Sequence, residues 1–267
     1  MSNFPLFVDF KGKCAFVCGS TSGIGQASAI VLASMGASIT LIARNEEKLA
    51  STLKLLTSNP EQNHDYIVAD FSYPEELQSK VARYLAGEKV IHILVNNTGG
   101  PQKGEMETGK FSDIHTAFKK HLICNHLLAQ AVIPGMKKVA YGRIINITSY
   151  EAKEPVPARG ISATIRGAVS NWAKTMANEL GRHGITVNNI LPGVVETRRL
   201  PARIQEEVDK TGKTKEEVIQ YLTSPIPAGR FAQPEEIGWV VAFLASPAAA
   251  YINGINLPVD GGITKCL

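Results

Sequence analysis

The sequence has little cysteine, little net charge and no long apolar run, and each scarcity excludes a class of protein. Its 267 residues contain only Cys14, Cys18, Cys124 and Cys266, without a CxxC pair or a metal-ligand spacing. This pattern argues against a disulfide framework and against a zinc site. Because Cys14 and Cys18 lie in a buried-strand pattern, we expect reduced core thiols and no bound metal.

The formal net charge is only +4, and no block of basic residues is present, so we expect no nucleic-acid partner. No run of apolar residues could span a bilayer, and Met1–Phe10 is too short and interrupted for a secretory signal. We therefore expect a cytoplasmic protein without a membrane partner. A hydrophobic content of 44% over this length predicts one globular domain, residues 1–267.

Short β-rich apolar runs alternate with amphipathic segments along the chain. Most runs are continuously apolar, as strands covered on both faces must be. The alternation predicts an α/β fold, a single Rossmann-type doubly wound parallel sheet of about seven strands with helices on both faces. The predicted strands are Cys14–Val17, Ser38–Ile42, Tyr66–Ala69, Ile91–Val95, Arg143–Ile147, Thr186–Ile190 and Ile255–Val259.

A glycine-rich segment, Cys18-Gly19-Ser20-Thr21-Ser22-Gly23-Ile24-Gly25, connects the first predicted strand to a helix. Glycines let the backbone turn tightly and approach a pyrophosphate, and the helix N-terminus supplies free N–H groups and a positive dipole end. The segment therefore predicts a dinucleotide site in the first βαβ unit.

The second predicted strand ends in Ala43-Arg44. An NAD site usually has an acidic residue at the position of Ala43, where it accepts hydrogen bonds from a ribose hydroxyl. A guanidinium can instead bind a 2′-phosphate in a bidentate manner, so Arg44 predicts NADP(H) over NAD. The alternative is that Arg44 is a solvated residue at the start of a helix.

These motifs and three others, in register over nearly the whole chain, resemble the short-chain dehydrogenase/reductase family. The further matches are Asp70, Asn96-Asn97-Thr98-Gly99 and Leu191-Pro192-Gly193-Val194-Val195-Glu196-Thr197, with a similar C-terminal strand region around Val259. In the family, the position of Asp70 contacts the adenine, and the Asn-Asn-x-Gly motif follows the fourth strand. The third motif, which ends in the position of Thr197, holds the nicotinamide amide. The resemblance implies cofactor binding by Gly19, Ser20, Thr21, Ser22, Gly23, Ile24, Gly25, Arg44, Asp70, Phe71, Asn97, Thr98, Gly99, Pro192, Gly193, Val195 and Thr197.

The family's catalytic pattern is only partly present. Ser149 occupies the position of the family serine, which orients the substrate. The family tyrosine donates a proton, and a lysine four residues later lowers its pKa and holds the ribose. Aligned on Ser-Ala-Thr, these two positions are Ile161 and Ile165, and the position of the family asparagine is His121. We therefore expect an atypical site without the usual Tyr-xxx-Lys.

Three residues are candidates for catalysis: Ser149, His121 and Arg166. Histidine can donate a proton near neutral pH, whereas arginine retains its proton and is suited to holding a ribose or an anion. Ordered water is an alternative proton source, and a half-buried structural role is an alternative for His121. The chain also resembles a divergent subgroup, similar to 3-oxoacyl-carrier-protein reductases, with Asn-x-x-Gly-Gly-Pro and Ser-xxx-Arg. Residues 96–101 and 162–166 match these two patterns.

The resemblance implies an NADP-dependent oxidoreductase that reduces a 3-oxoacyl thioester or another ketone. The alternative is a non-catalytic NADP-binding sensor or assembly protein, because a fold alone does not establish catalysis. The family also implies a homo-oligomer, a dimer or a tetramer. Residues 197–227 contain two charged amphipathic stretches, which predict a substrate lid over the carboxyl edge of the sheet.

Overall fold

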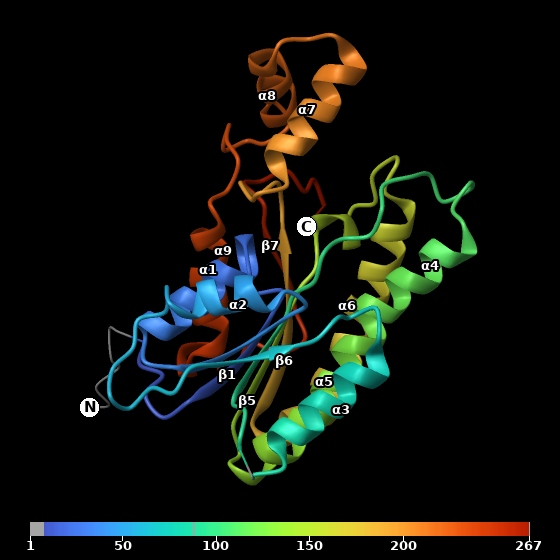
Figure 1. The fold of residues 1–267 in the computed structure, drawn as a ribbon. Helices are drawn as coiled ribbons and strands as arrows, with labels where there is room; N and C mark the ends of the chain where they lie inside the picture. The colour runs from blue at the N-terminus through green and yellow to red at the C-terminus, as the bar shows by residue number, and fades with distance from the viewer. Residues whose placement is uncertain (1–7, 88, 267) are drawn as a thin grey trace.

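Seven parallel strands form one sheet in the computed structural model, which describes residues 8–87 and 89–266. The strand order is β3-β2-β1-β4-β5-β6-β7, so the predicted doubly wound parallel sheet is confirmed (Figure 1). Most of the Met1–Phe10 segment lies outside the described residues. The strands are β1 (Cys14–Cys18), β2 (Ser38–Ala43), β3 (Asp65–Val68), β4 (Ile93–Asn96), β5 (Gly142–Ile147), β6 (Ile185–Pro192) and β7 (Asn256–Val259).

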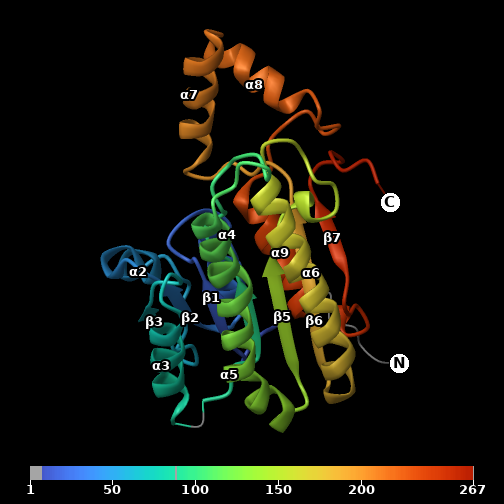
Figure 2. The ribbon, with the colours of Figure 1, turned by 90° about the vertical axis from the view of Figure 1, so that its right-hand side faces the viewer.

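Helices cover both faces of the sheet (Figures 1 and 2). One face packs against α1, α2 and α9, and the other packs against α3, α5 and α6. The helices are α1 (Gly23–Ser34), α2 (Glu46–Leu53), α3 (Pro74–Leu85), α4 (Phe111–Phe118), α5 (Cys124–Lys138), α6 (Gly160–Leu180), α7 (Leu200–Thr211), α8 (Lys215–Thr223) and α9 (Pro234–Ala245). A π-helical turn (Lys119–Ile123) joins α4 to α5, and 3-10 turns span Tyr150–Ala152, Gly181–His183 and Pro247–Ala249.

The first strand shows why the apolar runs are continuous. Ala15 and Val17 pack into the core beneath α1 and α9, whereas Phe16 and Cys18 pack into the core beneath α3, α5 and α6. Successive side chains of a strand point to opposite faces, and both faces of this sheet are covered. Residues at both odd and even positions of the strand are therefore apolar, and the sequence does not alternate between apolar and polar residues.

A row of asparagines links four neighbouring strands. Asn96 of β4 donates to Asn146 of β5 at 2.9 Å, and Asn146 donates to Asn189 of β6 at 2.8 Å. Asn189 in turn donates to Asn256 of β7 at 2.8 Å. These four residues occupy matching positions in the strand register. Buried amides require partners, so this asparagine ladder fixes the register of the strands directly below the site.

The segment predicted as a lid forms α7 and α8, which project above the carboxyl ends of the strands (Figures 1 and 2). Thr214 and Glu217 form a capping box that starts α8, with the Glu217 N–H donating to the Thr214 hydroxyl oxygen at 3.2 Å. The two helices share a small apolar cluster of their own around Leu200, Ile204 and Leu222. Among the described residues, none of the helices is long and apolar enough to cross a membrane.

Candidate active site

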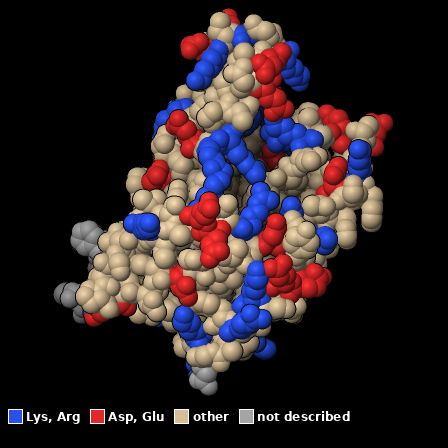
Figure 3. Space-filling model, viewed as in Figure 1, with Lys and Arg blue, Asp and Glu red and all other residues tan. Residues whose placement is uncertain are grey.

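A cavity of about 1310 Å³ opens at the carboxyl ends of β1, β4, β5 and β6. The strand order reverses between β1 and β4, and such a switch point leaves a crevice outside the strand ends. The space-filling view shows this hollow beneath α7 and α8, with Lys and Arg side chains around it (Figure 3). Its volume exceeds the roughly 300–1,000 Å³ of pockets for drug-sized ligands, so it has room for a dinucleotide and a substrate together.

The glycine loop after β1 is built into this crevice by close backbone packing. Gly19 has a φ of +58°, and a Cβ there would lie 2.7 Å from the carbonyl oxygen of Asn97. The Asn97 side chain donates to the Cys18 carbonyl oxygen at 3.2 Å, which ties the loop after β4 to the loop after β1. A Cβ at Gly25 would collide with the Gly19 carbonyl oxygen. Both glycines are therefore required by close approach of the backbone.

Two predicted cofactor motifs meet above the N-terminus of α1. A Cβ at Gly23 would lie 2.9 Å from the Thr197 side chain, so the threonine of the motif after β6 faces the glycine loop. The hydroxyl of Ser20 is fully buried and has no partner among the described residues. The first residues of α1, Gly23 and Ile24, line the cavity, and the free N–H groups of a helix N-terminus fit an anion such as a pyrophosphate.

Arg44 follows β2 at the adenosine end of the cavity. Its side chain is 76% exposed and lies 4.0 Å from the Asp70 carboxylate. Burial alone would raise the pKa of Asp70, but hydrogen bonds from Ser72 and the charge of Arg44 together hold it below its usual value. Asp70 is thus ionised near neutral pH, and Arg44 retains free guanidinium N–H groups for a phosphate.

Most residues predicted to bind the cofactor border this one cavity. The exceptions are Ser20 and Gly25, which support the loop from behind. The predicted residues that line the cavity are Gly19, Thr21, Ser22, Gly23, Ile24, Arg44, Asp70, Phe71, Asn97, Thr98, Gly99, Pro192, Gly193, Val195 and Thr197.

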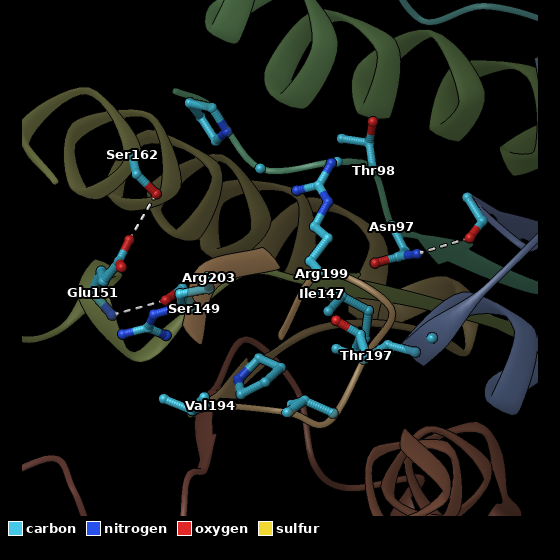
Figure 4. Close-up of a pocket in the computed structure, with 18 of the residues that line it drawn as sticks. Asn97, Thr98, Ile147, Ser149, Glu151, Ser162, Val194, Thr197, Arg199 and Arg203 are labelled. Atoms are coloured by element: carbon cyan, nitrogen blue, oxygen red, sulfur yellow. Dashed lines mark hydrogen bonds between the residues drawn. The ribbon is translucent and has the colours of Figure 1, made fainter. Parts of the chain in front are cut away.

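Ser149 lines the same cavity beyond the end of β5. It precedes the 3-10 turn Tyr150–Ala152, and its oxygen accepts a hydrogen bond from the Glu151 N–H at 3.2 Å. A serine hydroxyl that accepts in this way still has its own proton to donate. Ser149 is therefore placed to donate to an oxygen atom in the cavity (Figure 4).

The cavity-facing side of α6 carries Ser162 and Arg166, four residues apart. The Ser162 hydroxyl donates to the Glu151 carboxylate at 2.7 Å (Figure 4). The Arg166 Nε–H donates to the Ser162 oxygen at 3.1 Å. Arg166 also donates to the carbonyl oxygen of Thr148. Burial lowers the pKa of Arg166 to about 10, so the guanidinium remains charged at neutral pH.

Ile161 and Ile165 point elsewhere. Their side chains are buried in a small apolar cluster with Ala117 of α4, and neither lines the cavity. The two isoleucines that align with the family tyrosine and lysine thus pack against α4, and the neighbouring positions 162 and 166 line the cavity. Ile161 and Ser162 are about 100° apart around the helix, and packing against α4 decides which of the two faces the crevice.

His121 lies in the π-helical turn and is 5% exposed, outside the lining of the cavity. Burial, with the nearby charge of Arg166, lowers its pKa to about 3, although a hydrogen bond to the Gly99 backbone acts in the opposite direction. Its Nε2 atom has no partner among the described residues. The imidazole is neutral near pH 7, so this position does not favour His121 as a proton donor.

Sequence reasoning missed Glu151, Arg159 and Arg203 as residues of the site. All three line the cavity, and Arg159 lies 3.6 Å from the Glu151 carboxylate. A signal for Glu151 was its place two residues after Ser149, at the end of a parallel strand. No local signal distinguishes Arg203 from the other charged residues of its helix. Within the described residues, no group of three or more His, Cys, Asp or Glu side chains could hold a metal ion.

Comparisons with known proteins agree with this geometry. The sequence model of a family described as enoyl-(acyl carrier protein) reductase matches residues 19–264. The 3-oxoacyl-(acyl-carrier-protein) reductase of Vibrio cholerae is 32% identical over 259 residues, which cover 96% of this chain and 99% of that protein. The corresponding reductase of Rickettsia bellii is 32% identical over 256 residues, covering 96% and 98%.

Two solved structures of similar proteins contain a bound cofactor. The L-sorbose reductase of Gluconobacter frateurii, complexed with NADPH and L-sorbose, has a TM-score of 0.91 at 30% identity and covers 97% of this chain and 99% of its own. A variant of the actinorhodin polyketide ketoreductase with NADPH has a TM-score of 0.87 at 30% identity, covering 95% and 98%.

Proposed function

Because the chain belongs to the short-chain dehydrogenase/reductase family, we propose that it is an NADP(H)-dependent oxidoreductase that interconverts a carbonyl group and an alcohol. One observation carries the proposal. A single cavity combines the glycine loop and Arg44 with the hydroxyls of Ser149 and Ser162. Dinucleotide binding and polar contacts to a reacting oxygen are thus available in one place.

The assignment of NADP(H) is supported by two kinds of observation. The related L-sorbose reductase and polyketide ketoreductase structures contain NADPH. In this chain the glycine loop would hold the pyrophosphate, with Asp70 at the adenine, Thr197 at the nicotinamide amide and Arg44 at the 2′-phosphate. When bound, the nicotinamide supplies or accepts the hydride; the residues of the chain have to supply everything else.

Ser149 orients the reacting oxygen. Because its own oxygen accepts the Glu151 N–H, its hydroxyl proton is available to the substrate. A fixed donor of this kind holds the carbonyl in one orientation, and orientation accounts for much of the catalysis of a transfer between two bound molecules.

We assign the proton transfer to Ser162 and Glu151 in place of His121. In the oxidative direction, Ser162 accepts the proton of the substrate hydroxyl while its own proton passes along the 2.7 Å hydrogen bond to the Glu151 carboxylate. In reduction both protons move the opposite way. Arg166 donates to the Ser162 oxygen and stabilises negative charge on it during the transfer. The Ser-xxx-Arg pair therefore replaces Tyr-xxx-Lys on the cofactor-facing side of α6.

The helices α7 and α8 form the lid of this site. Arg199, Arg203, Tyr221 and Leu222 of the segment 197–227 line the cavity, so movement of the segment changes access to it. The substrate is a ketone or a 3-oxoacyl thioester, by analogy with the related reductases. The family resemblance further supports a homodimer or homotetramer.

A titration followed by a turnover assay tests the proposal. Calorimetry with NADPH and, in parallel, NADH should give binding that is selective for NADPH. The NADPH-bound protein should then oxidise its cofactor with at least one member of a panel of ketones and acyl thioesters. Tight NADPH binding without oxidation across the panel would favour the non-catalytic NADP-binding protein, and absence of binding would contradict both functions.

A further inference from the structure

The cavity carries far more positive than negative charge. Ten Lys or Arg residues line it, against only Asp70, Glu151 and Glu207. Arg44 lies at the adenosine end and serves the cofactor phosphates. The arginines that follow β5 and β6 lie near Ser149, and they require a separate explanation.

Two of these arginines, Arg159 and Arg203, interact electrostatically across the cavity, and few acidic groups offset their charge. The Nε atom of Arg159 lies 3.6 Å from the Glu151 carboxylate, which the Ser162 hydroxyl shares. Within the described part of the chain, the guanidinium of Arg203 makes no hydrogen bond and no ion pair within 4.0 Å. Burial lowers the pKa of Arg203, and the charge of Arg159 lowers it further. Like charges held together in a partly buried site favour an anion between them.

Tyr150 completes this group. It is half-buried, follows Ser149 directly and interacts electrostatically with both Arg203 and Arg159. Burial raises the pKa of Tyr150, so its hydroxyl is protonated at neutral pH and can donate to an anion. Two guanidinium forks and one phenol match the oxygens of a carboxylate or a phosphate.

This group is separate from the cofactor end of the cavity. Figure 4 shows Asn97 and Thr197 beside the strand that leads to the glycine loop, and Glu151, Ser162 and Arg203 at the other end, next to Ser149. Ser149, Tyr150, Arg159 and Arg203 line the same cavity, so a molecule whose oxygen is held by Ser149 can extend an anionic group toward the arginines.

We propose that Arg159, Arg203 and Tyr150 bind a carboxylate or phosphate of the substrate itself. The substrate is then a small oxo compound with an anionic group a few bonds from its reacting carbonyl, such as an oxo acid or a phosphorylated ketone. The inference rests on the proposed reductase function and defines its substrate class. It distinguishes this chain from an enzyme whose substrate is a neutral ketone or sugar.

Binding to the NADPH complex tests this directly, because it does not require turnover. Matched pairs are titrated by calorimetry: 2- and 3-oxo acids with their methyl esters, and phosphorylated ketones with the free ketones. Comparison of the oxo acid series with the phosphorylated ketone series shows which anion the site binds. At least one anionic member should bind about 10-fold or more tightly than its neutral partner, since hydrogen bonds to charged groups are stronger than those to neutral groups.

The variant Arg203→Gln should remove that preference and leave NADPH affinity unchanged. The side chain of Arg203 contributes no hydrogen bond to the described fold, so the variant should remain folded. Arg182→Gln, at an exposed arginine, is the matched control. Arg203→Lys should restore part of the preference. Equal binding of acids and esters, a preference that survives in Arg203→Gln, or no binding of any anionic member would overturn the inference.

The same titrations separate this inference from the proposed function. Anion-dependent binding without NADPH oxidation would sustain the anion site and contradict the reductase. Turnover of neutral ketones or pantetheine thioesters, with rates unaffected by Arg203→Gln, would sustain the reductase and contradict the anion site.

Discussion

The hydroxyl of Ser162 donates a 2.7 Å hydrogen bond to the buried carboxylate of Glu151, at the edge of the cavity that carries the cofactor motifs. Arg166, one turn later on α6, donates to the same serine oxygen. A hydroxyl held between a carboxylate and a guanidinium can pass a proton in either direction. This arrangement supports a reductase in which serine, arginine and glutamate replace the usual tyrosine and lysine.

Replacing Glu151 with Gln should separate proton transfer from binding. Glutamine keeps an oxygen that accepts from Ser162 but cannot take up a proton. We expect alcohol oxidation to slow by roughly 10²-fold, within the range of general acid–base contributions, with NADP⁺ affinity retained. Steady-state rates of the oxidative reaction measure this, with Glu179→Gln at an exposed site of α6 as control. Equal slowing in both variants would point to a structural effect.

Arg44 should determine the choice between NADPH and NADH. Arg44→Gln removes the cation that meets the 2′-phosphate, so the Kd for NADPH should rise about 10-fold while that for NADH stays constant. Calorimetric titrations of both cofactors provide the measurement, and the exposed Arg83→Gln on α3 serves as control. An equal loss of affinity for both cofactors would mean that Arg44 supports the loop and does not bind the 2′-phosphate.

The asparagine ladder should contribute measurably to stability. Asn146→Ala removes both hydrogen bonds of Asn146, so the Asn96 side-chain N–H loses its acceptor and the Asn189 Oδ1 loses its donor. Each unsatisfied group costs about 1–3 kcal/mol, so thermal unfolding should show a Tm lower by several degrees. Asn178→Ala, at an exposed position of α6, should leave Tm unchanged. Equal Tm values for the two variants would show that water satisfies the ladder.

His121 should make the fold sensitive to acid. Its pKa is about 3 in the folded protein and 6.5 in the unfolded chain, so between these values the unfolded state binds more protons. Stability therefore falls as pH decreases from 6.5 toward 3, by at most about 1.4 kcal/mol per pH unit for this group. His92, with a pKa lowered to about 4 by burial, acts in the same direction.

The variant His121→Asn should show a shallower decline of the free energy of unfolding over that range, measured by chemical denaturation at several pH values. Its turnover should change little, because the proton path is assigned elsewhere. Superimposable stability profiles would contradict the assignment of a low pKa, and a large loss of turnover would restore His121 as the proton donor.

The sequence predicted the seven strands because burial on both faces leaves continuous apolar runs, as in β1. It predicted the cofactor end because glycines, Asp70 and Thr197 follow strand ends, where the fold itself brings them together. The catalytic face of α6 was harder to predict. Ile161 and Ser162 are neighbours in the chain, and only the packing of Ile161 against α4 turns Ser162 toward the cavity. The burial of His121 likewise depends on a π-helical turn that no residue pattern in the sequence predicts.

The most direct test of proton transfer by Ser162 compares NADPH oxidation by the Ser162→Ala and Ser170→Ala variants. The assay uses a substrate that the wild-type protein accepts. Ser170 is a buried serine two turns further along α6, outside the lining of the cavity. We expect a loss of roughly 10²–10⁴-fold in kcat for Ser162→Ala only, with NADPH affinity intact in both variants. Undiminished turnover in Ser162→Ala would contradict the central claim, because the proton would then reach the substrate by another route.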